Sequence, residues 1–178
     1  MSINRRNFLK TSTAIAAGST LAIPHVASAA TAKSTKKLRV AIIGVGGRGG
    51  HGIRVAQGEN ITALCDVDAK RLEGVGKKFP DAKKYQDYRD MFKNTDDFDA
   101  VVISTPDHQH YPMAIRAIRA KKAVYCEKPL TLTMWESLQL AEESEKYKVA
   151  TQMGNQGMGS GGWRQAYDYI KGGAIGDV

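Results

Sequence analysis

The stretch that decides the fold, residues 38–66, reads LRVAIIGVGGRGGHGIRVAQGENITALCD. It begins with an almost unbroken apolar run rich in β-branched side chains, which is typical of a buried parallel strand. The segment Gly44–Gly49 follows with the spacing G-x-G-x-x-G, and a short helical pattern covers residues 50–57. A second apolar run, residues 61–65, ends on Asp66. This order predicts a strand, a tight turn, a helix and a second strand.

The glycine turn predicts a binding site for a dinucleotide pyrophosphate. Gly44 permits a sharp turn, Gly46 lets the backbone approach the phosphates, and Gly49 lets the helix pack closely against the strand. Gly47 and Arg48 complete the turn, beside N–H groups that attract negative charge at the helix start. The alternative is a flexible glycine turn, because the chain contains 18 glycines. A strand precedes the turn, and a helix and a second strand that ends on an acidic residue follow it. This context favours a dinucleotide-binding turn.

Asp66 bears on which dinucleotide binds. It lies 22 positions after Gly44, near the spacing expected for a carboxylate that binds the adenosine ribose hydroxyls. A carboxylate there repels a 2′-phosphate, so we expect NAD rather than NADP. Arg48 is the opposing feature, because a guanidinium binds phosphate of either kind.

Length and composition indicate one ordinary globular domain. The chain has 178 residues, of which 42% are hydrophobic and 25% charged. The net charge of +8 suggests a nucleic-acid partner, but no stretch combines dense Lys and Arg with stacking aromatic residues. We therefore expect no nucleic-acid partner, and a solvated basic surface instead.

The first 29 residues read as an export signal rather than as part of the fold. Arg5 and Arg6 are followed by Phe-Leu-Lys, a mildly apolar segment and the small-residue cleavage pattern Ala27-Ser-Ala29. This resembles a twin-arginine signal peptide, with Asn4 where Ser or Thr is usual. The apolar segment is too short to span a membrane, and the cleavage site has no Cys for a lipid anchor. We expect export to the periplasm or beyond, without a stable membrane anchor; the alternative is a disordered basic tail.

After a linker over residues 30–37, strands and helices alternate, which predicts an α/β doubly wound parallel sheet of the Rossmann type. Further strands are expected at residues 84–86, 99–104, 123–126 and 149–153, and further helices at 69–79, 87–93, 110–120, 133–147 and 163–171. Cys65 and Cys126 fall in the second and fifth strands, which are not neighbours in such a sheet, so two buried thiols are expected. No metal-ligand spacing of Cys or His appears.

Polar residues stand where the expected strands end. Thr105, Pro106 and His110 follow the fourth strand, and Glu127 and Lys128 follow the fifth. Each has an ordinary alternative, such as a strand stop, a helix cap or a surface ion pair. Ligands of open α/β sheets bind beyond the carboxyl ends of the strands, so the shared location favours a site.

The motifs GVGGRG, CD, ISTPDHQH and CEKPL together resemble the Gfo/Idh/MocA oxidoreductases, over residues 38–178. The resemblance implies that Thr105, Pro106 and His110 line the nicotinamide side, with Glu127 and Lys128 at the nicotinamide end. It also implies a cis bond before Pro129 and a catalytic role for Lys128, to which we add His110.

The family resemblance sets the expected domains and activity. Residues 38–153 are expected to form the dinucleotide-binding domain, and residues 154–178 to begin the connection to an antiparallel-sheet substrate domain that this chain does not contain. The expected function is hydride transfer between NAD and a hydroxyl of a sugar, cyclitol or glycoside, in a full-length parent enzyme that can form a homo-oligomer. Alternatives are an NAD-dependent glycoside hydrolase and a non-catalytic NAD-binding module. The chain alone is expected to be inactive.

Overall fold

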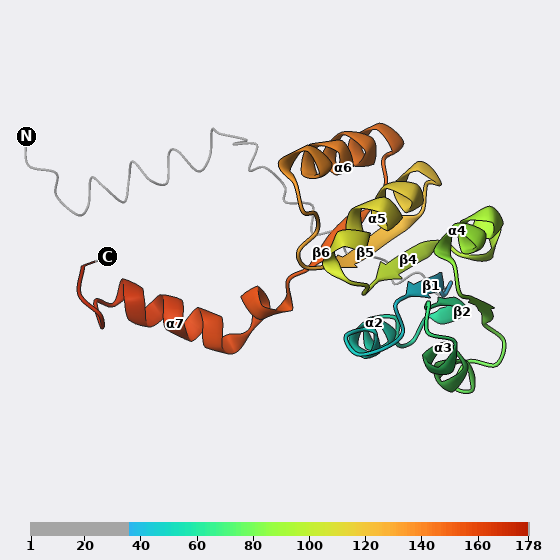
Figure 1. Cartoon of the computed structure of the whole chain (residues 1–178). Coiled ribbons are helices and arrows are strands. Elements are labelled where there is room, and N and C mark those ends of the chain that lie inside the picture. Colours follow the sequence, from blue (N-terminus) through green and yellow to red (C-terminus); the bar gives the residue numbers. More distant parts are fainter. Residues whose placement is uncertain (1–35, 178) are drawn as a thin grey trace, which may run out of the picture. The chain divides into compact units, whose positions relative to one another are not determined.

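The protein is described here by a computed structural model that covers residues 36–177. The expected signal peptide and almost all of the expected linker therefore lie outside the described residues. The described part contains a six-stranded sheet in which every neighbouring pair of strands is parallel (Figure 1). In spatial order the strands are β3 (Lys83–Tyr85), β2 (Asn60–Cys65), β1 (Arg39–Ile43), β4 (Ala100–Ile103), β5 (Ala123–Glu127) and β6 (Thr151–Gly154). This order confirms the doubly wound Rossmann sheet.

Helices cover both faces of the sheet (Figure 1). The α-helices are α2 (Gly49–Val55), α3 (Ala69–Gly76), α4 (Tyr88–Met91), α5 (His110–Arg119), α6 (Met134–Tyr147) and α7 (Gly161–Lys171). Three short 3₁₀ turns are η1 (Phe92–Asp97), η2 (Asp107–Gln109) and η3 (Gln156–Gly159). Helices α2 and α3 pack on one face and α4, α5 and α6 on the other, whereas α7 contains no buried residue.

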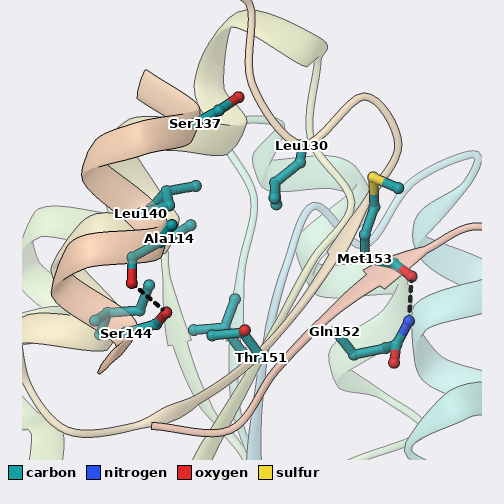
Figure 2. Close-up of a pocket in the computed structure, with 11 residues that line it drawn as sticks. Ala114, Leu130, Ser137, Leu140, Ser144, Thr151, Gln152 and Met153 are labelled. Carbon is teal, nitrogen blue, oxygen red and sulfur yellow. Dashed lines mark hydrogen bonds between the residues drawn. The ribbon is translucent and has the colours of Figure 1, made fainter. Parts of the chain in front are cut away.

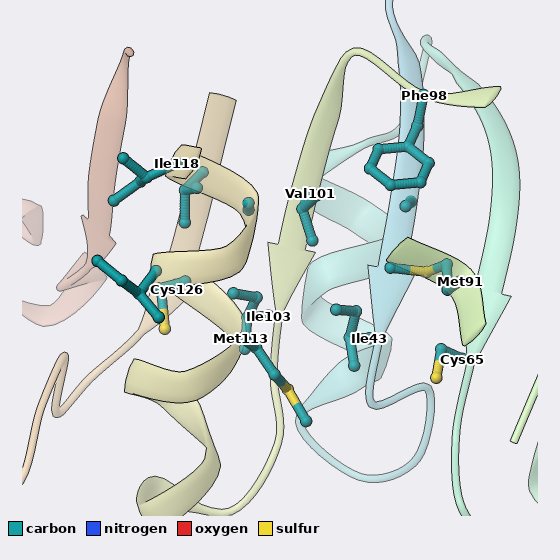
Figure 3. Packing of buried hydrophobic residues seen from close by; sticks show 14 of the residues in the cluster. Ile43, Cys65, Met91, Phe98, Val101, Ile103, Met113, Ile118 and Cys126 are labelled. Carbon is teal, nitrogen blue, oxygen red and sulfur yellow. The ribbon is translucent and has the colours of Figure 1, made fainter. Parts of the chain in front are cut away.

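The alternation of side chains along β1 explains the two-sided core. Val40 and Ile42 join the cluster under α2 and α3, whereas Ala41 and Ile43 join the cluster under α4, α5 and α6. Figure 3 shows this second cluster, in which Phe98 and residues of β4 and α5 close around Ile43. Both faces of the strand are buried, which is why its sequence is a continuous apolar run.

The two cysteines are buried and free, as expected. Cys65 lies on β2 and Cys126 on β5, with β1 and β4 between these strands. Burial raises the pKa of each thiol to about 12, and a neighbouring carboxylate, Asp66 or Glu127 respectively, adds to the effect. Such thiols stay protonated at neutral pH and are poor nucleophiles.

Candidate functional site

Two hollows of about 570 Å³ each lie at the carboxyl ends of the strands and share Ser104 and Thr105. The first, called the Asp66 pocket, is lined among others by Gly44, Gly46, Asp66, Arg71, Thr105 and Pro106. The second, called the Lys128 pocket, is lined among others by Arg48, Thr105, His110, Glu127, Lys128 and Gln156. The structure thus gathers nearly all the expected site residues along one edge of the sheet.

Asp66 is bound to the glycine turn. Its Oδ2 accepts hydrogen bonds from the N–H groups of Val45 at 2.9 Å and Gly46 at 3.3 Å, and its Oδ1 accepts from the N–H of Asp68 at 2.9 Å. The carboxylate therefore fixes the turn as well as facing the pocket. A carboxylate has about four acceptor sites, so it can still accept hydrogen bonds from ribose hydroxyls.

Each glycine of the motif has its own steric requirement. Gly44 has a φ of +83°, and a Cβ on it would lie 2.6 Å from the carbonyl oxygen of Ser104. A Cβ on Gly46 would instead lie 2.7 Å from Cδ of Arg71, the flexible part of a side chain. Gly47 has a φ of +52° and open space around it. Gly44 is therefore required by the protein itself, whereas the space above Gly46 is open to a ligand if Arg71 moves.

Arg71 was not anticipated from the sequence. It lies on α3, lines the Asp66 pocket, and its Nε is 3.2 Å from Oδ2 of Asp68. Arg48, in contrast, lines the other pocket. The guanidinium beside Asp66 is therefore that of Arg71, and only its position five residues after Asp66, on the helix that follows β2, could have indicated it.

Glu127 and Arg48 belong to a network with Gln156, which lies in the polar segment after the expected sixth strand but was not among the expected binding residues. Oε2 of Glu127 lies 3.1 Å from Nη2 of Arg48, and its Oε1 accepts a hydrogen bond of 3.0 Å from Nε2 of Gln156. Oε1 of Gln156 in turn accepts from Nη2 of Arg48 at 2.7 Å. This network ties the glycine turn to the ends of β5 and β6. The sequence signal for it was the Gly-Asn-Gln segment directly after the sixth strand.

Lys128 is exposed and lines the pocket next to Glu127, which is only 3% exposed. Within residues 36–177 its ammonium group has no hydrogen-bond or ion-pair partner. The following bond to Pro129 is cis, as expected. Lys128 is therefore available to a ligand at the mouth of the pocket.

His110 has a different environment from the one expected. The ring is 1% exposed, and its two nitrogens lie within hydrogen-bond distance of the carbonyl oxygens of Pro129 and Thr105. As placed, the ring has no nitrogen left for a cofactor or a substrate. His110 lines the Lys128 pocket, as expected, but with both ring nitrogens engaged by the chain it has no nitrogen free to exchange a proton with a ligand.

The residues present fit a dinucleotide. Ser104 Oγ and Glu127 Oε2 are buried without a hydrogen-bond partner among the described residues. Arg48 is close enough to Glu127 Oε2 for an ion pair, although it is not oriented for a hydrogen bond. Ser104 lies where the two pockets meet, and Glu127 lines the Lys128 pocket. Buried polar atoms without a hydrogen-bond partner cost free energy. A ligand with hydroxyl and amide groups, such as NAD, can satisfy them.

A third hollow, of about 270 Å³, lies between α5, α6 and β6 (Figure 2). Its lining is mainly apolar, and its polar side chains bond to the chain itself: Ser144 donates to the carbonyl of Ala141, and Gln152 to the carbonyl of Met153. No ionisable side chain lines it. It offers no chemistry and is not the candidate site.

Residues 36–177 were also compared with what a metal site and a membrane-spanning helix require. No group of three or more His, Cys, Asp and Glu side chains is arranged there to hold a metal ion. None of the helices described is long and apolar enough to cross a bilayer.

Comparison with known proteins supports both the dinucleotide-binding fold and the export signal. Residues 38–155 match the Gfo/Idh/MocA family model, described as an oxidoreductase family with an NAD-binding Rossmann fold, and residues 2–22 match the twin-arginine translocation signal sequence. A glycosyl hydrolase family 109 protein of Shewanella pealeana is 34% identical over 82% of this chain and 38% of its own length. The crystal structure of myo-inositol 2-dehydrogenase from Lactobacillus plantarum matches with a TM-score of 0.69 and 31% identity, over 80% of this chain and 43% of its own.

A further structure, scyllo-inositol dehydrogenase from Lactobacillus casei with bound NAD(H) and scyllo-inositol, matches with a TM-score of 0.68 and 25% identity, over 80% of this chain and 43% of its own. The chain thus spans about two-fifths of the length of these relatives. The twin-arginine match confirms that the N-terminus is a signal for export by this route.

Proposed function

Because the chain belongs to the Gfo/Idh/MocA family and carries its NAD-binding Rossmann domain, we propose that it is the cofactor-binding part of an exported oxidoreductase. The enzyme transfers hydride between NAD and a hydroxyl-bearing carbon of a sugar, cyclitol or glycoside. One observation carries this proposal: the Asp66 and Lys128 pockets adjoin at Ser104 and Thr105. An extended dinucleotide needs two such adjoining spaces, one for each half, at the carboxyl edge of the sheet.

In the Asp66 pocket the chain holds the adenosine half and the pyrophosphate. The carboxylate of Asp66 accepts hydrogen bonds from the ribose hydroxyls and disfavours a 2′-phosphate, which selects NAD over NADP. The backbone of the turn Gly44–Gly49 faces the pyrophosphate, and Arg48 of that turn adds positive charge from the side of the Lys128 pocket. The close approach at Gly46 keeps the phosphates against this backbone.

In the Lys128 pocket the chain holds the nicotinamide half and the reacting carbon. NAD supplies the hydride acceptor when it is bound. Ser104 and Thr105 line both pockets, whereas Pro106 lines only the Asp66 pocket. The buried carboxylate of Glu127 accepts hydrogen bonds from the ligand. The ammonium of Lys128, which has no partner among residues 36–177, donates to the oxygen of the substrate hydroxyl. It stabilises the negative charge that develops on this oxygen as the hydroxyl proton passes to water.

The proposal includes an organisation of the chain. Residues 1–29 are the signal removed on export, residues 30–37 form a linker, residues 38–153 bind the dinucleotide, and residues 154–178 lead toward a substrate domain. The export signal supports a location in the periplasm or outside the cell, with the export machinery as a partner. The inositol and glycoside relatives support a carbohydrate-like substrate.

The direct test is calorimetric titration of the chain with NAD and NADP. We expect binding of NAD, weaker binding of NADP, and a severalfold loss of NAD affinity in Lys128→Ala, because Lys128 lines the pocket that holds the nicotinamide half. Lack of NAD binding by the folded chain would refute the proposal. NADH absorbance with sugars and inositols, compared between Lys128→Ala and Lys122→Ala, tests for turnover in the chain or in a longer form of the protein.

The second candidate function is NAD-dependent glycoside cleavage, favoured by the likeness to the family 109 protein. In that reaction the hydride returns to the substrate, so a glycoside is hydrolysed without net formation of NADH. Release of an aryl group from an aryl glycoside at constant NADH absorbance would support glycoside cleavage over net oxidation. A third, a non-catalytic NAD-binding module, is selected by NAD binding without either activity.

A further inference from the structure

His110 contacts two groups that can only accept hydrogen bonds. Its Nδ1 lies 2.6 Å from the carbonyl oxygen of Pro129, and its Nε2 lies 2.9 Å from the carbonyl oxygen of Thr105. Neutral imidazole has a single N–H, so in either neutral tautomer one nitrogen lone pair would face an oxygen lone pair. Both contacts are hydrogen bonds only if both ring nitrogens carry a proton.

We propose that His110 is a positioning residue whose doubly protonated ring ties the loop after β4 to the loop after β5 and thereby orients Lys128. The contribution to catalysis rests on the proposed function, because Lys128 is the reacting residue only there. The tie itself is independent of any cofactor.

The positions around Lys128 show how such a tie acts on it. On one side, Glu127 is held by Arg48 and Gln156. On the other side, the carbonyl of Pro129 is held by His110. The backbone of the exposed Lys128 is therefore fixed at both of its neighbours, so its side chain starts from a defined point at the pocket mouth. Such support from neighbouring residues is what a precise functional site requires.

The charges around the ring decide whether it can hold two protons. Burial and the position at the start of α5 both disfavour a cation. The carboxylates of Asp107 on η2 and Glu127 on β5 line the same pocket, as do the cations Arg48 and Lys128. Arg48 is already paired with Glu127, and Lys128 is exposed. Two short bonds from a charged donor are stronger than neutral ones and oppose the cost of burial.

The ring state can be observed directly by NMR of the full chain with ¹⁵N-labelled histidine rings. We expect two one-bond ring N–H signals from His110, both absent in His110→Gln and both retained in His108→Ala. His108 is the matched control because it is exposed and only two residues away. It lines the Asp66 pocket, which holds the half that NAD and ADP-ribose share, so its effect cancels in a ratio of their affinities. A single ring N–H from His110 in the folded chain would overturn the proposal.

Hydrogen exchange measured by mass spectrometry tests the tie between the loops. In His110→Ala the amides of Thr105, Asp107, Lys128, Leu130 and Thr131 should exchange at least about tenfold faster, while those of β1 and β2 stay protected. His108→Ala should leave both loops unchanged. Unchanged loops in His110→Ala would contradict the tie. If His110→Ala does not fold, His110→Gln, which keeps one donor, is measured in its place.

The positioning role needs a readout that loop packing alone does not change. The ratio of NAD affinity to ADP-ribose affinity isolates the nicotinamide end, because ADP-ribose lacks nicotinamide. We expect this ratio to fall severalfold in His110→Gln and to stay constant in His108→Ala. An unchanged ratio would reduce His110 to a structural tie and overturn its positioning role. Absence of binding by the unmodified chain would count against the proposed function, whereas the NMR and exchange results would still judge the tie.

Discussion

A Cβ atom on Gly49 would stand 2.0 Å from the carbonyl oxygen of Gly44. The first residue of α2 is thus in direct contact with the first residue of the turn, five positions earlier, and both atoms involved belong to rigid backbone. A Cβ atom on the neighbouring Gly50 would instead meet nothing within 4 Å. Two adjacent glycines of one helix therefore have opposite steric requirements.

This contrast predicts opposite effects of one substitution. Gly49→Ala should lower the free energy of unfolding by about 1–3 kcal/mol, because the backbone it meets cannot move aside. Gly50→Ala should leave it unchanged or raise it by about 0.5–1 kcal/mol, because alanine loses less conformational entropy in a helix. Urea denaturation of both variants measures the difference. Equal stabilities would mean that α2 does not lie as close to the turn as the structure has it.

Asp66 leads to a prediction about cofactor choice. In Asp66→Ser, NAD affinity should fall about tenfold, because charge-assisted hydrogen bonds to the ribose are lost. NADP affinity should fall less, because relief of the repulsion of its 2′-phosphate offsets the weakened support of the glycine turn. The gap between the two cofactors therefore narrows. Competition titrations measure it, with Asp81→Ser as a control for the change in net charge at an exposed site. If the unmodified protein already prefers NADP, Arg71 dominates over Asp66.

The strands of the sheet and the polar residues at their carboxyl ends could be predicted from the sequence, because their signals are local. The apolar run of β1, the glycine turn and the polar residues after each strand can each be read from a few adjacent positions. The start of α6 has a local signal of the same kind, a Thr three residues before a Glu. The side chain of Thr133 accepts from the N–H of Glu136, and the side chain of Glu136 accepts from the N–H of Thr133.

Boundaries were less predictable where the chain turns. The sixth strand was expected from residue 149 but begins at Thr151. Lys148 adopts a left-handed conformation with φ +53°, and the N–H of Val149 still bonds to the carbonyl of Ser144. These two residues complete the end of α6, so the apolar Val149 packs against the core without joining the sheet.

Partnerships across long sequence separations were not predictable from local pattern. Arg48 and Gln156 are 108 positions apart, and nothing adjacent to either indicates the other. The same holds for Arg71 above Gly46 and for the two carbonyl partners of His110. Spacing identified His110 as a site residue, but only the folded geometry gives the two carbonyl oxygens that its ring contacts.

The ion pair between Arg39 and Asp99 predicts how stability depends on pH. The hydrogen bonds from Arg39 lower the pKa of Asp99 to about 2. A lowered pKa in the folded state stabilises the protein above the ordinary value near 4 and loses that effect as the pH falls from about 4 to 2.

Asp99→Asn should therefore cost about 0.5–1 kcal/mol at pH 7, as expected for a partly exposed pair, and nearly nothing at pH 2. Unfolding curves at several pH values measure this, with Asp81→Asn as the matched control. Asp87, whose pKa is also about 2 because of Arg89, will leave part of the acid dependence in place. A constant difference between Asp99→Asn and the unmodified protein from pH 7 to pH 2 would contradict the assignment.

The last prediction separates two reasons for a glycine at position 46. Gly46→Val should abolish NAD binding, because the side chain fills the space that the pyrophosphate needs. The fold should survive, since the nearest atoms to a new Cβ belong to the flexible side chain of Arg71 rather than to the backbone. Calorimetry and thermal unfolding of the single variant test these two statements.

The double variant Gly46→Val/Arg71→Ala then distinguishes the two causes of lost NAD binding. If the loss comes from a displaced Arg71, removing that side chain restores NAD binding; if it comes from collision with the phosphates, binding stays absent. We expect no restoration, with Arg71→Ala alone still binding NAD, and restored binding in the double variant would show that the glycine makes room for the arginine instead of the cofactor.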